Sequence, residues 1–164
     1  IASAALAGAG RIIAIDREPS KEALARQFGA TDFVLAGDDT VAQVVELTKG
    51  GVHHAFECIG LAATATQAFL MIRRGGLATV IGMIPQGQMV SLPGAGFLDE
   101  RKIQGSLMGS NRFPVDMPRI VDAYMAGKLD LDAMISRRIP LSQVNEAFAE
   151  MKTGKLARSV IVFD

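Results

Sequence analysis

Asp16 is the residue whose type and position carry the clearest chemistry in the sequence. It directly follows a short apolar run at residues 12–15. A carboxylate at the carboxyl end of the second strand of a nucleotide-binding α/β unit can accept hydrogen bonds from both hydroxyls of an adenosine ribose. It also repels a 2′-phosphate, because two like charges about 4 Å apart near a protein surface interact by about 4 kcal/mol. The position therefore favours NAD over NADP, while a helix-capping or solvated aspartate remains the alternative interpretation.

Three basic residues could assist such an acid. Arg17 offers a flat guanidinium on which a ring can stack, and Lys21 offers a cation near the same ribose. Arg158, just before the last apolar run, could bind a phosphate. Arginine and lysine are also common on any protein surface, so each residue taken alone could be an ordinary surface charge rather than a ligand contact.

Two further segments place glycine immediately after an apolar run, at residues 56–60 and 80–83. Glycine at the end of a parallel strand lets the backbone come close to a ligand at the carboxyl edge of the sheet. One such glycine is a weak indication of a ligand site, and only its repetition after two apolar runs is informative. The candidate ligand-lining residues are Cys58, Ile59, Gly60, Ile81, Gly82 and Met83, and Met108 also stands where a cofactor ring could pass.

Metal chemistry is not expected within this sequence. His53 and His54 are neighbours in a strand pattern, so their side chains would point to opposite faces and could not chelate one ion together. Cys58 is the single cysteine, which excludes an internal disulfide and a cysteine-rich zinc site. At the end of a buried strand, Cys58 is expected to pack rather than to act as a nucleophile.

The overall composition narrows the class of protein. The 17 basic and 17 acidic residues cancel, and no basic stripe stands out, which argues against a nucleic-acid partner. No apolar run is long enough for a membrane span, and no basic signal-peptide start precedes one. The single cysteine fits a reducing cytoplasm. A chain of 164 residues suits one domain with a real core.

The elements that must position these residues alternate between short apolar strands and helices. Strands are expected at residues 11–16, 32–35, 52–57, 77–81, 102–108 and 159–163, with helical patterns between them. Ser142 is the expected N-cap of the last helix. Continuous apolar strands alternating with helices predict a doubly wound α/β fold, in which a parallel sheet is covered on both faces.

The usual partner of Asp16 is missing from this pattern. A glycine-rich turn should lie about 20 residues upstream, after a first strand. Gly8 and Gly10 precede a strand rather than follow one, so they do not qualify. We therefore expect the fold to lack its first strand and glycine loop in this chain, and we expect the chain to belong to a longer polypeptide. In the strand order 3-2-1-4-5-6, that strand would lie between strands 11–16 and 52–57.

Several of these segments together resemble the zinc-dependent medium-chain alcohol dehydrogenases, in particular the branch with class III and aryl-alcohol dehydrogenases. The resemblance covers essentially the whole chain. It rests on residues 11–16, 28–32, 56–60, 91–93, 145–148 and 158–161.

The resemblance implies a Rossmann fold with particular site residues. Asp16 and Lys21 would hold the adenosine ribose, and Arg158 would reach the pyrophosphate. The backbone around Cys58, Ile59, Gly60, Ile81, Gly82 and Met83 would line the ribose and nicotinamide, and main chain at Leu107 and Met108 would contact the carboxamide. The family's zinc ligands and proton-relay residues have no counterpart here, so no catalytic residue is expected in this chain. A homodimer would form through an edge strand around residues 89–108.

These inferences predict the coenzyme-binding part of an NAD-dependent oxidoreductase acting on a primary alcohol or aldehyde, inactive as this chain alone. Residues 1–110 would form an incomplete NAD-binding domain, and residues 111–164 would return toward an absent catalytic domain that holds the zinc. Three alternatives remain: an S-adenosylmethionine methyltransferase, a truncated nucleotide-binding or structural domain without catalysis, and a zinc-free relative similar to quinone reductases. The last usually prefers NADP, against which Asp16 argues.

Overall fold

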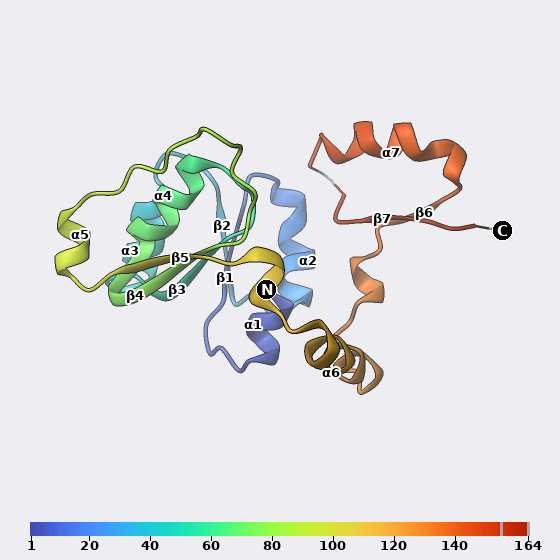
Figure 1. The fold of residues 1–164 in the computed structure, drawn as a ribbon, viewed down its shortest axis with the longest axis horizontal. Helices are drawn as coiled ribbons and strands as arrows, with labels where there is room; N and C mark the ends of the chain where they lie inside the picture. The colour runs from blue at the N-terminus through green and yellow to red at the C-terminus, as the bar shows by residue number, and fades with distance from the viewer. Residues whose placement is uncertain (155, 164) are drawn as a thin grey trace. The chain divides into compact units, whose positions relative to one another are not determined.

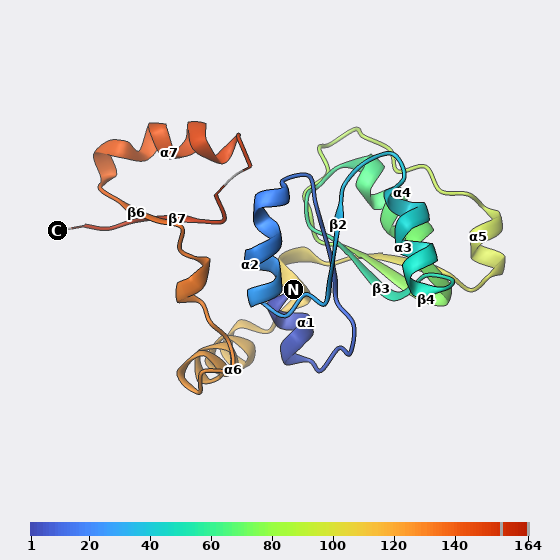
Figure 2. The same ribbon diagram turned by 180° about the vertical axis from the view of Figure 1, so that it is seen from behind.

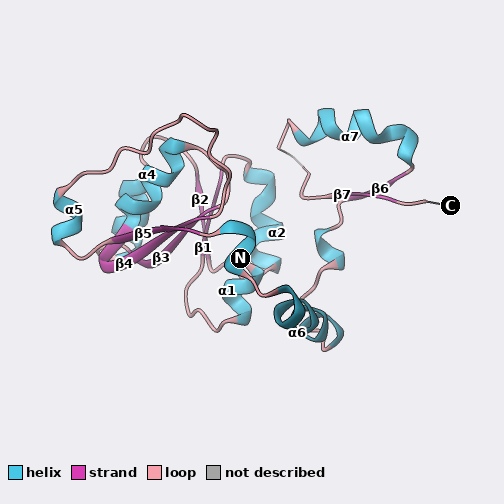
Figure 3. Ribbon diagram, in the orientation of Figure 1, coloured by secondary structure: helices cyan, strands magenta, loops and turns pink. Residues whose placement is uncertain are grey.

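The computed structural model describes residues 1–154 and 156–163 (Figure 1). The chain divides into two compact units, one formed by Ile1–Leu35 with Phe113–Asp164 and the other by Ala36–Arg112. Helices and strands alternate along the chain, as the secondary-structure colouring in Figure 3 shows. Among the described residues, no helix combines the length and the apolar character that crossing a membrane requires.

The unit Ala36–Arg112 contains a parallel sheet of three strands. Strands β3 (Val52–Glu57), β4 (Ile72–Val80) and β5 (Lys102–Gly105) pair in that order. Both strand pairs are parallel, and their register places Glu57, Val80 and Gly105 in one row. The carboxyl ends of the three strands therefore lie at the same edge of the sheet.

Two helices cover this sheet. Helix α4 (Ala62–Met71) packs on β3 and β4, and helix α3 (Thr40–Thr48) packs beside α4. Figures 1 and 2 show the two helices side by side from opposite views. The core consists of Ala68, Phe69, Ile72 and Ala78, all buried. The short helix α5 (Ala95–Leu98) adds the ring of Phe97, whose centroid lies 5.1 Å from that of Phe69.

The first part of the other unit is a β-α-β motif. Strands β1 (Ile13–Asp16) and β2 (Asp32–Leu35) are parallel, and the connection contains the 3-10 turn η1 (Pro19–Lys21) and helix α2 (Glu22–Gln27). The short helix α1 (Ala2–Leu6) precedes it. Small side chains let α2 approach the strands closely, since the buried cluster is Ala14, Ala25 and Ala30 with Phe33 against it.

The second part of this unit is built from short elements. Helix α6 (Phe113–Met125) is followed by the 3-10 turn η3 (Asp132–Met134) and strand β6 (Arg137–Ile139). The 3-10 turn η4 (Leu141–Gln143) then leads into helix α7 (Val144–Met151). Strand β7 (Ser159–Ile161) pairs in parallel with β6.

The fold class is as expected: an α/β chain whose strand pairs are all parallel among the described residues. Strands β2 and β3 have the predicted bounds. Within the described part of the chain, β1 pairs with β2 alone and β3 with β4 alone, so no ladder joins β1 to β3.

The structure differs from the expected elements in several places, and β1 and β7 are also shorter than the expected strands 11–16 and 159–163. Strand β4 begins at Ile72, five residues early, because Ile72 already pairs with Val52 before the register shifts to Leu77 opposite His54. Strand β5 ends at Gly105, because Met108 and Gly109 have positive φ angles that no strand adopts. Ser142 lies inside η4 and does not cap α7, whose N-cap is Gln143. Strand β6 was not predicted, since three residues with two adjacent arginines show no strand pattern.

One ion pair ties the start of β1 to β2. Arg11 donates from Nε and Nη2 to the two carboxylate oxygens of Asp32, each at 2.8 Å. The Thr31 hydroxyl donates to Asp32 Oδ2 at 2.6 Å and also meets the carbonyl of Ile12 at 3.1 Å. The hydrogen bonds from Arg11 and then from Thr31 hold the pKa of Asp32 well below its usual range.

We expect the free energy of unfolding to depend on Asp32 in a pH-dependent way. The folded-state pKa is lowered, so the carboxylate contributes stability above its unfolded pKa of about 3.9, and this contribution is lost as the pH falls toward the lower folded value. In urea unfolding of the full-length polypeptide, Asp32→Asn should be less stable than wild type near neutral pH. The difference should shrink in acid.

The control is Glu22→Gln, which removes an exposed i,i+4 pair with Arg26. Such pairs contribute about 0.3–0.5 kcal/mol, so this variant should stay close to wild type. An Asp32→Asn variant equal to wild type at neutral pH would contradict the role assigned to the ion pair.

Candidate functional site

In the unit Ala36–Arg112, every predicted site residue comes shortly after the last residue of a strand, at the carboxyl edge of the sheet. Cys58, Ile59 and Gly60 follow Glu57 at the end of β3, and Ile81, Gly82 and Met83 follow Val80 at the end of β4. Leu107 and Met108 come after Gly105 at the end of β5. In open parallel sheets, ligands bind at this edge. The structure therefore brings these eight residues to one edge, as the sequence predicted.

Two of the glycines allow the turns after β3 and β4 to touch. A Cβ atom at Gly82 would lie 2.1 Å from the amide nitrogen of Gly60, and one at Gly60 would lie 2.5 Å from the carbonyl oxygen of Met83. Gly60 also has a φ of +91°, which other residues rarely adopt. Both positions therefore require glycine, because at each of them the neighbouring turn occupies the space that a side chain would fill.

The side chains that flank these glycines are apolar and exposed. Ile59 is 68% exposed, Met83 90% and Leu107 86%. Met108 is 67% exposed and stands in a left-handed run with Gly109 and Ser110. The Asn111 side chain donates to the carbonyl of Met108 at 3.0 Å. Exposed apolar side chains that surround the polar backbone groups of such turns are typical of ligand-binding sites.

Cys58 differs from its expected role. It is exposed, so it does not pack in the core as the sequence suggested. Partial desolvation of the thiol, and secondly the nearby charge of Glu57, raise the pKa of Cys58. A raised pKa leaves less thiolate at neutral pH, and the expectation that Cys58 is not a nucleophile stays a prediction.

In the unit that begins with Ile1, Asp16 ends β1 with a carboxylate held from two directions. Its Oδ1 accepts a hydrogen bond from the amide of Glu18 at 3.0 Å, and its Oδ2 accepts one from Lys21 Nζ at 3.1 Å. The structure therefore brings Asp16 and Lys21 together, while their roles at a ribose stay a prediction. A carboxylate offers about four acceptor positions, so two remain for further donors.

The other two basic residues lie in the same unit. The Arg17 guanidinium is largely exposed, 3.9 Å from Glu18, and its Nη2 would lie 3.3 Å from a Cβ at Gly154. Arg158 is exposed, and its backbone carbonyl accepts a hydrogen bond from the amide of Ser136 at 2.8 Å. That bond extends the β6–β7 pairing and fixes the point from which the Arg158 side chain leaves.

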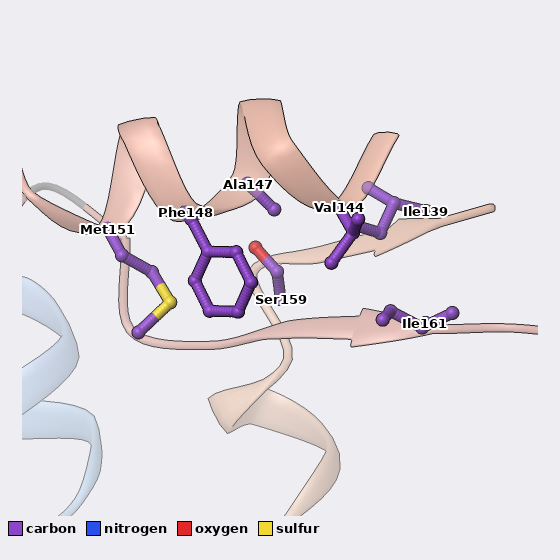
Figure 4. A pocket seen from close by; sticks show the side chains of 7 residues that line it. All are labelled: Ile139, Val144, Ala147, Phe148, Met151, Ser159 and Ile161. Carbon is purple, nitrogen blue, oxygen red and sulfur yellow. The ribbon is translucent and has the colours of Figure 1, made fainter. Parts of the chain in front are cut away.

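An apolar cavity of about 90 Å³ lies between α7, β6 and β7 (Figure 4). Ligand pockets usually measure about 300–1,000 Å³, so this cavity is too small for a dinucleotide. None of the predicted site residues lines it. Its lining residues are Ile139, Val144, Ala147, Phe148, Met151, Ser159 and Ile161.

The two histidines of β3 have partners other than a metal. Nε2 of His53 lies 2.9 Å from Nη1 of Arg73, and the ring of His54 stacks on Phe56 with centroids 6.4 Å apart. Across the residues that the structure describes, no cluster of three or more histidine, cysteine, aspartate or glutamate side chains could hold an ion. The sequence-based expectation of no zinc ligand here stays a prediction.

Sequence reasoning missed Glu57 and Thr64. Glu57 is 3% exposed, and its Oε1 accepts hydrogen bonds at 2.8 Å from the amides of Ile59 and Gly60 and from the Thr64 hydroxyl. The available signal was an acid at the end of a strand, directly before a glycine turn.

Parallel strands joined by helices, with glycine turns at the carboxyl edge and an acid after β1, define a dinucleotide-binding α/β domain of the Rossmann type. The zinc-binding dehydrogenase family matches residues 1–122, and the chain belongs to this family. The match covers both the Asp16 turn and the glycine turns.

Individual relatives agree with this assignment. The class-3 alcohol dehydrogenase of Myxine glutinosa is 39% identical over 160 residues, which make up 95% of this chain and 43% of that protein. The crystal structure of benzyl alcohol dehydrogenase from Acinetobacter calcoaceticus superposes with a TM-score of 0.92 at 27% identity, covering 99% of this chain and 45% of the other. A zinc-binding dehydrogenase from Sinorhizobium meliloti 1021, solved with NADP bound, gives a TM-score of 0.86 at 30% identity, covering 99% and 48%. The chain thus spans less than half the length of these relatives.

The contact between the glycine turns predicts a large effect of Gly82→Ala on stability. The added methyl group would overlap the amide of Gly60, and overpacking of this kind costs about 1–3 kcal/mol. Gly105→Ala is the matched control, because a Cβ there meets nothing within 4 Å. Urea unfolding of the full-length polypeptide measures both. Equal stability of the two variants would show that the turns do not touch.

Proposed function

We propose that this chain is the coenzyme-binding part of an NAD-dependent alcohol dehydrogenase, which transfers hydride between a primary alcohol or aldehyde and nicotinamide. The observation that carries the proposal is Asp16 at the carboxyl end of β1, in a chain that belongs to the zinc-binding dehydrogenase family. Relatives described as alcohol dehydrogenases support the substrate class.

Asp16 would bind the adenosine ribose. The amide of Glu18 and the ammonium of Lys21 already orient its carboxylate, and the two free acceptor positions suit the two ribose hydroxyls. A 2′-phosphate at the same place would meet a negative charge, so NAD is favoured although one relative binds NADP. Lys21 assists Asp16, Arg17 offers its guanidinium plane to the adenine side, and Arg158 would contact the pyrophosphate.

The carboxyl edge of the sheet β3-β4-β5 would hold the nicotinamide half. The main chain of the turns that carry Gly60 and Gly82 would line the ribose, and Cys58 and Ile81 would supply main-chain groups beside it. Ile59 and Met83 offer apolar surface for the ring, and the backbone at Leu107 and Met108 would receive the carboxamide. These residues bind and orient the coenzyme, and none of them transfers a proton or coordinates a metal.

The catalytic zinc would be held outside residues 1–164, where it would act as a Lewis acid on the alcohol oxygen. This chain on its own would therefore be inactive, and its contribution would be to place the nicotinamide against the substrate. Its single cysteine fits a cytoplasmic location. No nucleic acid or membrane partner is proposed, because acidic and basic residues balance.

The proposal predicts a change of coenzyme use in Asp16→Gly of the full-length enzyme. Charge-assisted hydrogen bonds contribute about 1.5–3 kcal/mol each, so kcat/KM for NAD should fall by about one to two orders of magnitude. The preference for NAD over NADP should fall with it. Asp38→Asn, in an exposed loop, is the control and should leave both values unchanged. An unmutated enzyme that uses NADP as efficiently as NAD would overturn the assignment of Asp16.

We further propose a homodimer formed through the edge around residues 89–108. Met89 is 85% exposed and Leu98 88%, and among the described residues β5 of the same segment pairs with β4 alone, which leaves its other edge open. Sedimentation analysis of the full-length protein should give twice the monomer mass. Met89→Glu with Leu98→Glu should shift the protein toward monomer, whereas Met125→Glu, equally apolar and exposed on α6, should not. A monomeric wild type would refute this assembly.

A further inference from the structure

Glu57 is a buried acid whose contacts are concentrated on a single oxygen. It ends β3 and is 3% exposed. Its Oε1 accepts hydrogen bonds from the amides of Ile59 and Gly60 and from the hydroxyl of Thr64, each at 2.8 Å. Its Oε2 is buried and lacks a hydrogen-bond partner among the described residues. The carboxylate therefore acts as one strong acceptor at the base of the turn after β3.

The main chain of Glu57 connects this turn to the next one. Its carbonyl oxygen accepts hydrogen bonds from the amides of Ile81 at 2.8 Å and Gly82 at 3.1 Å. A Cβ at Gly82 would lie 2.5 Å from Oε2, so the turn after β4 rests directly on the Glu57 side chain. One residue thus fixes the turns after β3 and β4 together.

Burying a carboxyl group is costly unless hydrogen bonds compensate it, so a residue with only a packing role here would be apolar. The turns that Glu57 fixes carry Ile59, Gly60, Gly82 and Met83. We propose that Glu57 is a positioning residue for coenzyme binding, which sets the distance between these two turns without touching the coenzyme. This inference rests on the proposed function, because it assumes that the turns line the nicotinamide half.

The unpaired Oε2 makes the proposal specific. Glutamine keeps an acceptor oxygen of the same reach and replaces only the oxygen that has no partner, so Glu57→Gln should preserve the turns. Methionine has a similar length and volume but no strong acceptor, so Glu57→Met should leave the amides of Ile59 and Gly60 unsatisfied. Aspartate can accept a hydrogen bond from an amide two residues on, as Asp16 does from Glu18. It is one methylene shorter than glutamate, so in Glu57→Asp the carboxylate should withdraw from the Gly82 backbone that now rests on it.

The experiment compares these variants in the full-length enzyme with Val44→Ala as the control. Val44 is 1% exposed in α3, so this truncation weakens the core of the same unit without touching the turns. The first readout is amide hydrogen exchange at residues 59–60 without coenzyme. The second is the dissociation constant for NADH from fluorescence titration, and the third is the urea midpoint.

We expect faster exchange at residues 59–60 in Glu57→Met, and NADH bound at least about tenfold more weakly in both Glu57→Met and Glu57→Asp. Glu57→Gln should stay within about threefold of wild type in NADH affinity. Val44→Ala should lower the urea midpoint while leaving NADH affinity near wild type, which separates positioning from stability. If Glu57→Met does not fold, the comparison of Gln with Asp decides the question.

The inference would be overturned by NADH affinity in Glu57→Met or Glu57→Asp equal to wild type, or by a loss in Glu57→Gln as large as theirs. A loss of affinity in Val44→Ala as large as that in Glu57→Met would also overturn it, since stability alone would then explain the effect. A wild-type enzyme that binds no NADH would instead refute the proposed function. In that case the exchange data still report whether Glu57 holds the turns.

Discussion

The parallel register of β3, β4 and β5 is the constraint on which the candidate site depends. It aligns Glu57, Val80 and Gly105 in one row, so the residues that follow each strand emerge at a common edge. A shift of one residue in either strand pair would turn each side chain to the opposite face. It would also separate Gly60 from Gly82, whose backbones now touch. The three-residue turns are therefore positioned by ladder hydrogen bonds formed elsewhere in the sheet.

The Asp16 turn illustrates a second way of holding a site, through local hydrogen bonds. The amide of Glu18 and the ammonium of Lys21 both come from the segment directly after β1, so the carboxylate is oriented within six residues. This local origin explains why the sequence was informative here. The proline and lysine of η1 lie at fixed distances along the chain from Asp16, and no long-range contact is needed to bring Lys21 to the acid.

The sequence predicted the parallel α/β fold, because short apolar runs such as residues 12–15 alternate with helical segments, which is characteristic of it. It could not predict that Ile72 pairs with Val52 directly after a helix, since a register shift depends on the partner strand. It also could not predict the left-handed run at Met108, Gly109 and Ser110, because two of these three residues disfavour positive φ. The role of Glu57 was missed for a similar reason: its partners are backbone amides, which the residue types do not reveal.

The central claim is that the Asp16 turn and the turns after β3 and β4 bind NADH in the full-length enzyme. Hydrogen–deuterium exchange with and without saturating NADH tests it most directly, because it follows each segment separately. The account predicts slower exchange at residues 16–21, 58–60 and 81–83 when NADH is bound, and unchanged exchange in the exposed loop at residues 36–39. Saturating NADH that protects none of these three segments would contradict it.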